Sequence, residues 1–212
     1  FLPMIYKGIS PILAAVLVVA FTTVVTMCMV DGITKKSVAA MLGTIIGVVF
    51  SGAFALIFGQ VTSITGYNVS DIENLVYVGE MTDIKIGELL FAGILIASLG
   101  AVMDVGMSIA STLNELKEQN PQMMLKELFQ SGMNVGKDMM GTMTNTLILA
   151  FTGGSINTLV FIFAYNYEYQ QVINMYSVGI EIMQGLSSSL GVIMAVPVTS
   201  WITAFLYSKN QK

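Results

Sequence analysis

The sequence predicts an all-α bundle of about five membrane-spanning helices, forming a single domain over residues 1–212. Two observations support this fold. First, 55% of the residues are hydrophobic and only 10% are charged, whereas soluble domains carry roughly 25% charged residues. Second, apolar runs long enough to cross the hydrocarbon layer, separated by short polar connections, make up most of the chain. We therefore expect a multi-pass protein whose solvent is the lipid bilayer.

The first two expected spans cover residues 11–30 and 38–58. In the second span a small residue recurs at every fourth position, which lets a neighbouring helix approach closely in lipid. We call this stripe the small-residue seam and expect it to be the best helix-packing face of the chain. Its members are Gly43, Gly47, Ser51, Ala55 and Gly59.

Polar connections flank the third expected span, residues 86–110. The acidic segment 61–85, which includes Asp71, is predicted to be a loop. The segment 111–130 is predicted to be an exposed connection. Within it, Asn120 followed by Pro121 is typical of a helix start and predicts a short amphipathic helix on the membrane surface.

The fourth expected span, residues 138–164, contains the pair Gly153-Gly154. Either the helix is broken there, or it ends and the second apolar stretch lies at the interface or re-enters the membrane. Four tyrosines between residues 165 and 176 are typical of a headgroup region. The last expected span covers residues 178–206.

Lysine placement predicts the orientation. If the spans alternate, Lys7 and Lys85 fall on one side and all other lysines on the opposite, cytoplasmic side by the positive-inside rule. Phe1 is then outside and Lys212 is inside a bacterial cell membrane. The lysines expected in the cytoplasm are Lys35, Lys36, Lys117, Lys126, Lys137, Lys209 and Lys212.

Asp104 is the main functional candidate, because it lies deep in the third span, where a carboxylate costs about 3 kcal/mol on insertion scales. Helical spacing places Ser108 on its face. In the fourth span Asp138, Thr142 and Asn145 also share one face. Counting inward from the connection between the two spans puts Asp104 and Asn145 at similar depth, so we expect a hydrogen bond between them.

A third polar face in the last span carries Glu181 and Gln184. Together, the three faces are expected to line a route for an ion or small molecule, because intramembrane carboxylates that exchange a proton or cation are typical of coupled transport. The alternative is that Asp104 is neutral or hydrogen-bonded and only fixes the helix register.

The composition argues against several other functions. The chain has no histidine, and Cys28 is its only cysteine, so we expect no hydrolase triad, metal site, cofactor or enzymatic activity. The nine basic residues are scattered lysines, and a nucleic-acid-binding protein needs a basic stripe.

Four sequence runs carry a family resemblance. They are KKSVAAMLGTIIG from Lys35, GAVMDVGMSIAS from Gly100, ELFQSGMNVGKD from Glu127 and MGTMTNTLILA from Met140. With these runs the chain closely resembles the YibE/F family of bacterial multi-pass membrane proteins. The resemblance implies further membrane helices upstream of Phe1. It marks as signature positions Asp104, Asp138, Thr142, Thr144 and Asn145.

Two hypotheses for function follow. The first is a transporter-like or channel-like permease component, with Asp104 and Asn145 at its polar centre and Glu181 near an outer vestibule. The second is a non-transporting scaffold or accessory subunit, which docks partner helices of a second copy or another subunit on the small-residue seam. Transport requires a water-accessible cavity at Asp104, whereas a scaffold requires that carboxylate to be sealed in protein. A third role, lipid handling, would require a polar groove open sideways to the bilayer.

Overall fold

The computed structural model describes residues 1–69 and 72–208, and this part of the chain contains helices and no strand. Four helices, α2, α3, α5 and α9, are long and apolar enough to cross a membrane, and the bent pair α6 and α7 is either a fifth, broken span or a re-entrant loop. The predicted all-α bundle of about five spans is confirmed. The elements are α1 (Leu2–Ile5), α2 (Pro11–Asp31), α3 (Lys35–Thr62), η1 (Gly66–Asn68), α4 (Ile72–Met81), α5 (Ile86–Gln119), α6 (Leu125–Gly154), α7 (Ile156–Ala164), α8 (Tyr169–Ile173) and α9 (Tyr176–Ser208).

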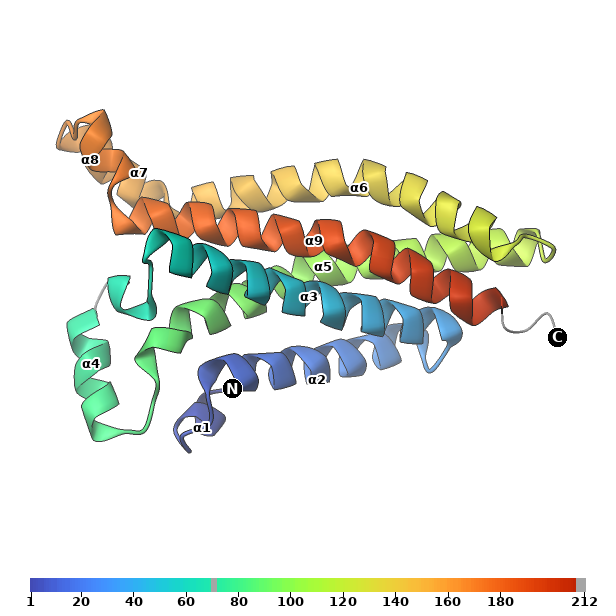
Figure 1. The fold of residues 1–212 in the computed structure, drawn as a ribbon, viewed down its shortest axis with the longest axis horizontal. Coiled ribbons are helices and arrows are strands. Elements are labelled where there is room, and N and C mark those ends of the chain that lie inside the picture. Colours follow the sequence, from blue (N-terminus) through green and yellow to red (C-terminus); the bar gives the residue numbers. More distant parts are fainter. Residues whose placement is uncertain (70–71, 209–212) are drawn as a thin grey trace.

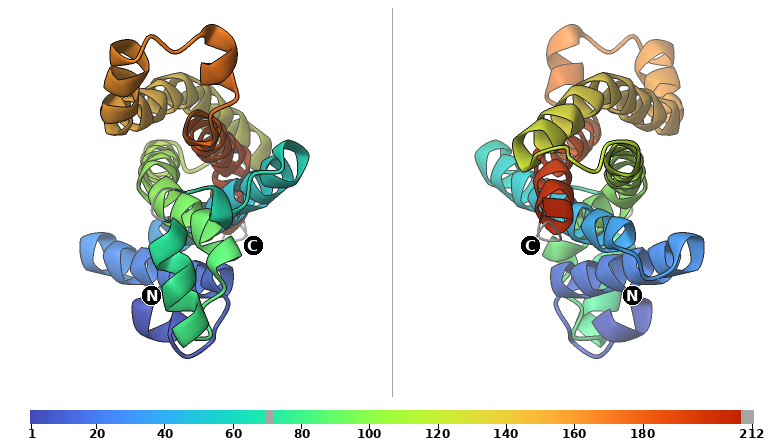
Figure 2. Two further views of the ribbon diagram at one scale, coloured as in Figure 1. Left: turned by 90° about the vertical axis from the view of Figure 1, so that its left-hand side faces the viewer. Right: turned by 90° about the vertical axis from the view of Figure 1, so that its right-hand side faces the viewer.

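The long helices run side by side along the molecule (Figure 1). The core lies where α9 packs against α3, α5 and α6, and where α3 packs against α5. Helix α2 covers the other side of α3 and α5, so that α2 and α6 lie at opposite sides of the bundle in the end-on views (Figure 2).

The small-residue seam lies at the centre of this packing, and all five of its members are buried. A Cβ atom placed on Gly47 would lie 2.8 Å from the Cβ of Ala195 and 3.2 Å from the backbone oxygen of Gly191, both on α9. A Cβ on Gly59 would lie 2.7 Å from the ring of Phe91 on α5. The seam is therefore filled by helices of the same chain, which leaves it unavailable to a partner helix.

The connection between α5 and α6 is much shorter than expected. Helix α5 continues to Gln119, and Asn120 is its C-cap residue rather than the start of a new helix. Leu113 is fully buried, so the amphipathic pattern of residues 111–119 extends α5 along the bundle. The prediction of a separate surface helix beginning at Asn120-Pro121 is wrong.

The segment 61–85 is also more ordered than a loop. Helix α3 reaches Thr62, and α4 covers Ile72–Met81. Exposed Glu73 and Glu80 alternate with half-buried apolar residues along α4, and this amphipathic spacing explains why the segment is helical. The loop prediction is wrong for this segment, although Asp71 lies outside the described residues.

The glycine pair in the fourth span marks a bend. Helix α6 ends at Gly154, and α7 leaves at an angle of 56° after Ser155. The Ser155 hydroxyl donates to the backbone oxygen of Phe151 at 3.0 Å. Two adjacent glycines weaken the helix at this point, and after the bend α7 and α8 lie at one end of the bundle (Figure 1).

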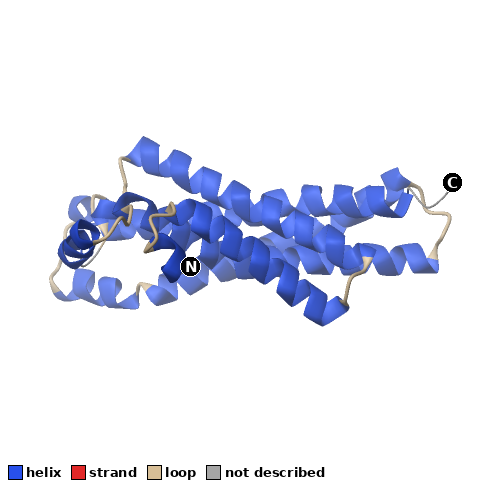
Figure 3. Ribbon diagram, turned by 90° about the horizontal axis from the view of Figure 1, so that it is seen from below, coloured by secondary structure: helices blue, strands red, loops and turns tan. Residues whose placement is uncertain are grey.

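The connections α2–α3 and α5–α6 lie at the same end of the molecule, as alternating spans require (Figures 1 and 3). This arrangement places Lys35, Lys36, Lys117 and Lys126 toward one end. Lys209 and Lys212 lie outside the described residues. The assignment of this end to the cytoplasm stays a prediction from the positive-inside rule.

Candidate functional site

Asp104 lies near the middle of the 34-residue helix α5, on a surface of the bundle that no other helix covers. Gly93, Ala97, Gly100 and Asp104 form one exposed row, which we call the outer face of α5. A Cβ atom on Gly93 or Gly100 would meet nothing within 4 Å. Within residues 1–69 and 72–208, the Asp104 carboxylate has neither a hydrogen bond nor an ion pair. Ser108, one turn further on, is half-buried.

Helix α6 carries a second exposed polar row, formed by Asp138, Gly141, Thr142 and Asn145. The Thr142 hydroxyl is 3.4 Å from the Asp138 backbone oxygen, to which it donates. The amide of Asn145 has no hydrogen-bond partner among the described residues. Both rows thus face outward from the bundle.

The expected hydrogen bond between Asp104 and Asn145 is absent from the described structure. The two residues nevertheless lie at similar depth along the bundle. Leu113 of α5 packs against Gly132 of α6. Because the two helices are antiparallel, Asp104, nine residues before Leu113, is level with Gly141, nine residues after Gly132. Asn145 lies about one turn, roughly 6 Å, further along α6. Both side chains are exposed, and their helices direct them to the surface rather than toward each other. Counting along the chain gave their approximate depth but not their rotation about the helix axes.

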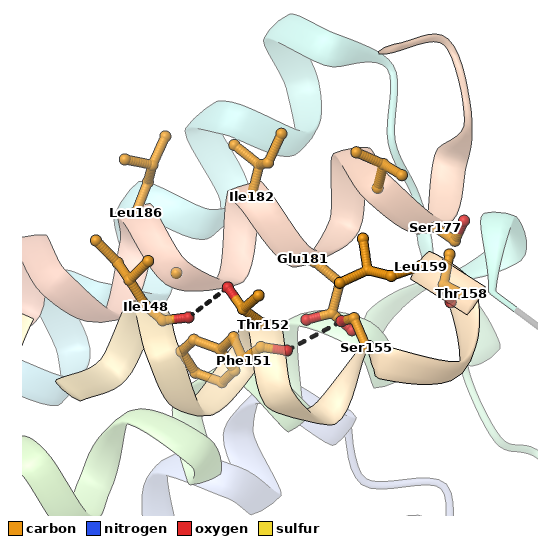
Figure 4. Close-up of a pocket in the computed structure, with 12 residues that line it drawn as sticks. Ile148, Phe151, Thr152, Ser155, Thr158, Leu159, Ser177, Glu181, Ile182 and Leu186 are labelled. Atoms are coloured by element: carbon orange, nitrogen blue, oxygen red, sulfur yellow. Dashed lines mark hydrogen bonds between the residues drawn. The ribbon is translucent and has the colours of Figure 1, made fainter. Parts of the chain in front are cut away.

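Glu181 belongs to a different site. It lines a cavity of about 280 Å³ between α6, α7 and α9. Figure 4 shows the Glu181 side chain extending from α9 toward α6, beside Ser155. The carboxylate is half-buried and has neither an ion pair nor a hydrogen bond within the described part of the chain. The predicted polar face of the last span carried both Glu181 and Gln184. Only Glu181 lines this cavity, and Gln184 is half-buried outside it.

Most of the cavity wall is apolar, with Ile148, Leu159, Ile182 and Leu186 among its residues. The hydroxyl protons on the α6 side are already used: Thr152 donates to the backbone oxygen of Ile148 at 2.8 Å, and Ser155 donates to Phe151. Their oxygen lone pairs remain free to accept hydrogen bonds. The cavity thus combines one carboxylate and hydroxyl acceptors with hydrocarbon walls.

A second cavity, of about 360 Å³, adjoins the first along the α6–α9 contact. It is lined by Gly141, Thr144 and Asn145 from α6 and by Ile193 from α9, and it shares Ile148 with the Glu181 cavity. The structure therefore brings Asn145 and Glu181 to one side of the bundle, along α6 and α9, and leaves Asp104 outside both cavities.

A set of buried hydroxyls on α9 and α3 was not among the sequence-predicted sites, apart from Ser51, which belongs to the small-residue seam. They have no hydrogen-bond partner in the described structure. Several lie where α9 approaches a neighbouring helix closely: a Cβ on Gly191 would be 2.7 Å from the Cβ of Ser51 on α3, and a Cβ on Gly132 of α6 would be 2.6 Å from the hydroxyl oxygen of Ser200. The run of small residues in α9 was the available signal. These residues are Thr44, Ser51, Ser187, Ser188, Ser189, Thr199 and Ser200.

Comparison with known proteins gives one match. The family model described as YibE/F-like protein matches residues 1–209. No curated protein and no solved structure matches significantly.

Proposed function

The chain belongs to the YibE/F-like family and is an integral membrane protein with four to five apolar spans; from this premise we propose that it is a transporter-like permease component. Asp104 is its membrane-embedded ionisable group. The polar path follows the outer face of α5 and the neighbouring polar row of α6, and it carries an ion or small molecule.

One observation carries the proposal: Asp104, which has no hydrogen bond or ion pair to any residue that the structure describes, is exposed near the middle of an apolar helix. In contact with lipid its charged form costs about 3 kcal/mol on insertion scales. Water or polar protein beside α5 removes most of that cost, and Gly93 and Gly100 leave space for either. A carboxylate in such a setting can bind and release a proton or cation, which is the elementary step of coupled transport.

The chemistry of α6 supports the same path. Asp138 and Thr142 are exposed at about the height of Asp104, so they supply further oxygen ligands along one direction through the membrane. The scaffold alternative is weaker, because the small-residue seam on which it would dock a partner is already filled by α9 and α5.

Flux measurements on the full-length protein in proteoliposomes test this function. We expect proton, sodium or rubidium flux from the parent protein and a drop of about tenfold or more in Asp104→Asn, since a loss of about 1.4 kcal/mol in transition-state stabilisation has that effect. Asp83→Asn, which removes an exposed acid between α4 and α5, is the matched control and should keep the parental flux. Thermal unfolding in detergent checks that both variants are folded. Parental flux in a folded Asp104→Asn variant would remove Asp104 from the mechanism.

A further inference from the structure

The two adjoining cavities form one lateral groove between α6 and α9. It runs from Asn145 past Ile148 to Glu181, and its cavities measure about 360 and 280 Å³. Asn145, Ile148, Ile182 and Leu186 are all exposed at the surface of the bundle. The groove therefore opens to the side, toward the bilayer, and does not run through the core.

The bend in the fourth span creates the wide end of the groove. Because α7 leaves α6 at 56°, Thr158 and Leu159 of α7 form one wall of this end, opposite Ser177 and Val178 at the start of α9. At Gly185 a Cβ atom would lie 3.8 Å from the Phe151 ring, which is only an ordinary contact. The helices are thus close enough to form walls but leave room for a hydrocarbon chain.

The charged end of the groove is at Glu181, and the uncharged polar residues Thr144 and Asn145 line its other end. Glu181 is in the first two turns of α9, near the tyrosine-rich segment formed by α8 and its flanking residues. Tyrosines are enriched at the headgroup level of membranes. Toward Ile148 and Leu186 the walls become hydrocarbon. This change from polar to apolar matches the shape of an amphiphile that lies along the groove.

The charge and the hydrogen-bonding capacity select the head of that amphiphile. An unpaired carboxylate in apolar surroundings favours a cation, because the pair offsets part of the desolvation cost. The neighbouring hydroxyl oxygens of Thr152 and Ser155 accept hydrogen bonds, since their protons are donated to backbone oxygens. A primary ammonium group supplies a positive charge and three N–H donors. An anionic head group would be repelled by the negative charge of Glu181. A trimethylammonium head group has no N–H donor for the hydroxyl oxygens, so it should bind more weakly than a primary ammonium group.

We propose that the lateral groove binds an amphiphile that carries a primary ammonium group, with this group at Glu181 and the hydrocarbon chain along Ile148, Ile182 and Leu186. An aminophospholipid of the bilayer and a free alkylamine share this chemistry. The ammonium site at Glu181 is separate from Asp104, so it does not rest on the proposed transport path; the two proposals share only Gly141 and Asn145, which line the far end of the groove.

Native mass spectrometry of the full-length protein in detergent tests the proposal. The probes are phosphatidylethanolamine, phosphatidylglycerol and phosphatidylcholine with identical acyl chains, and decylamine. We expect the parent protein to retain phosphatidylethanolamine or decylamine in preference to the other two lipids. Retention should fall about tenfold in Glu181→Gln, as expected for the loss of a partly buried charge pair. Retention of decylamine alone identifies a free amine as the ligand, and retention of both probes shows that the membrane lipid is also accepted.

Two further variants separate the groove from general effects. Gly185→Leu fills the cavity beside Phe151 and should reduce binding of every amphiphile, whereas Glu80→Gln removes an exposed acid on α4 and should change nothing. Thermal unfolding checks that each variant is folded. If Gly185→Leu does not fold, the nearly isosteric Glu181→Gln alone tests the proposal. Two results would overturn the proposal. One is equal retention of phosphatidylethanolamine and phosphatidylglycerol together with no binding of decylamine. The other is unchanged retention of the amine probes by a folded Glu181→Gln variant. Asp104→Asn should bind amines like the parent, even if it has lost flux.

Discussion

Glycine has opposite roles at different positions of this bundle. At Gly47 the nearest atoms to an added Cβ are the Cγ1 of Val102 at 2.7 Å and the Cβ of Ala195 at 2.8 Å. These atoms belong to short side chains on neighbouring helices and cannot move without shifting a backbone. At Gly93, on the outer face of α5, nothing lies within 4 Å of the same position. Gly47 is therefore required for close helix packing, whereas Gly93 lies on a surface where an added Cβ atom would contact no other helix.

We predict that Gly47→Ala destabilises the protein by about 1–3 kcal/mol, because overpacking separates α3 from α5 and α9. Thermal unfolding in detergent measures this loss. Gly93→Ala is the matched control and should leave stability unchanged or slightly raised, since alanine has the higher helix propensity. A Gly47→Ala variant as stable as the parent would show that α3 and α9 are further apart than this packing requires.

At the scale of elements, a lysine side chain bridges the connection between α5 and α6. The Lys117 ammonium group donates to the backbone oxygens of Pro121 and Met123 at 2.8 and 2.7 Å. It therefore satisfies carbonyl groups in the turn where α5 has ended and α6 has not begun. This contact explains how a five-residue connection, residues 120–124, joins two helices of 34 and 30 residues.

We predict that Lys117→Met loosens this turn. Loss of two charge-assisted hydrogen bonds in a solvent-exposed turn should cost about 1–2 kcal/mol of local stability. Hydrogen exchange of peptides covering residues 120–128 should accelerate accordingly. Lys126→Met, at an exposed position on α6 whose ammonium group has no hydrogen bond among the described residues, provides the control. Equal exchange in the two variants would mean that the turn is held by its backbone alone.

At the scale of the whole molecule, the uncovered surface of α5 lies between α2 and α6 on one side of the bundle (Figure 2). This surface contains Asp104 and a row of small residues, whereas other exposed surfaces of the long helices carry large apolar side chains. Ile57 on α3, for example, is 52% exposed. The difference in side-chain size and polarity indicates that protein or water, rather than lipid, covers the outer face of α5.

Spin labelling of the full-length protein in liposomes checks this inference. In a Cys28→Ser background, a nitroxide at Ala97→Cys should show low accessibility to dissolved oxygen, which concentrates in lipid. The same label at Ile57→Cys should show high accessibility. Equal oxygen accessibility at the two positions would mean that α5 faces hydrocarbon, and the polar path proposed along it would then be untenable.

Much of the fold was predictable because membrane spans obey simple rules. Hydrophobic length predicted each of the long helices. The glycine pair predicted that the fourth span breaks or ends there, and the structure has a bend of 56° at this point. The errors concerned polar segments. Residues 72–81 and 111–119 are helical because neighbouring elements supply apolar partners for them, and a window of sequence contains no information on those partners.

The sequence by itself determined that this protein is a membrane bundle of the YibE/F-like family, with Asp104 and Glu181 in two of its long apolar helices. Only the tertiary structure decided which way these side chains face: Asp104 outward from α5, and Glu181 into the groove between α6 and α9. The physical reason is that helical periodicity fixes which residues share a face. The rotation of each helix in the bundle follows instead from the close contacts of small residues, such as Gly47 with Gly191, between distant parts of the chain.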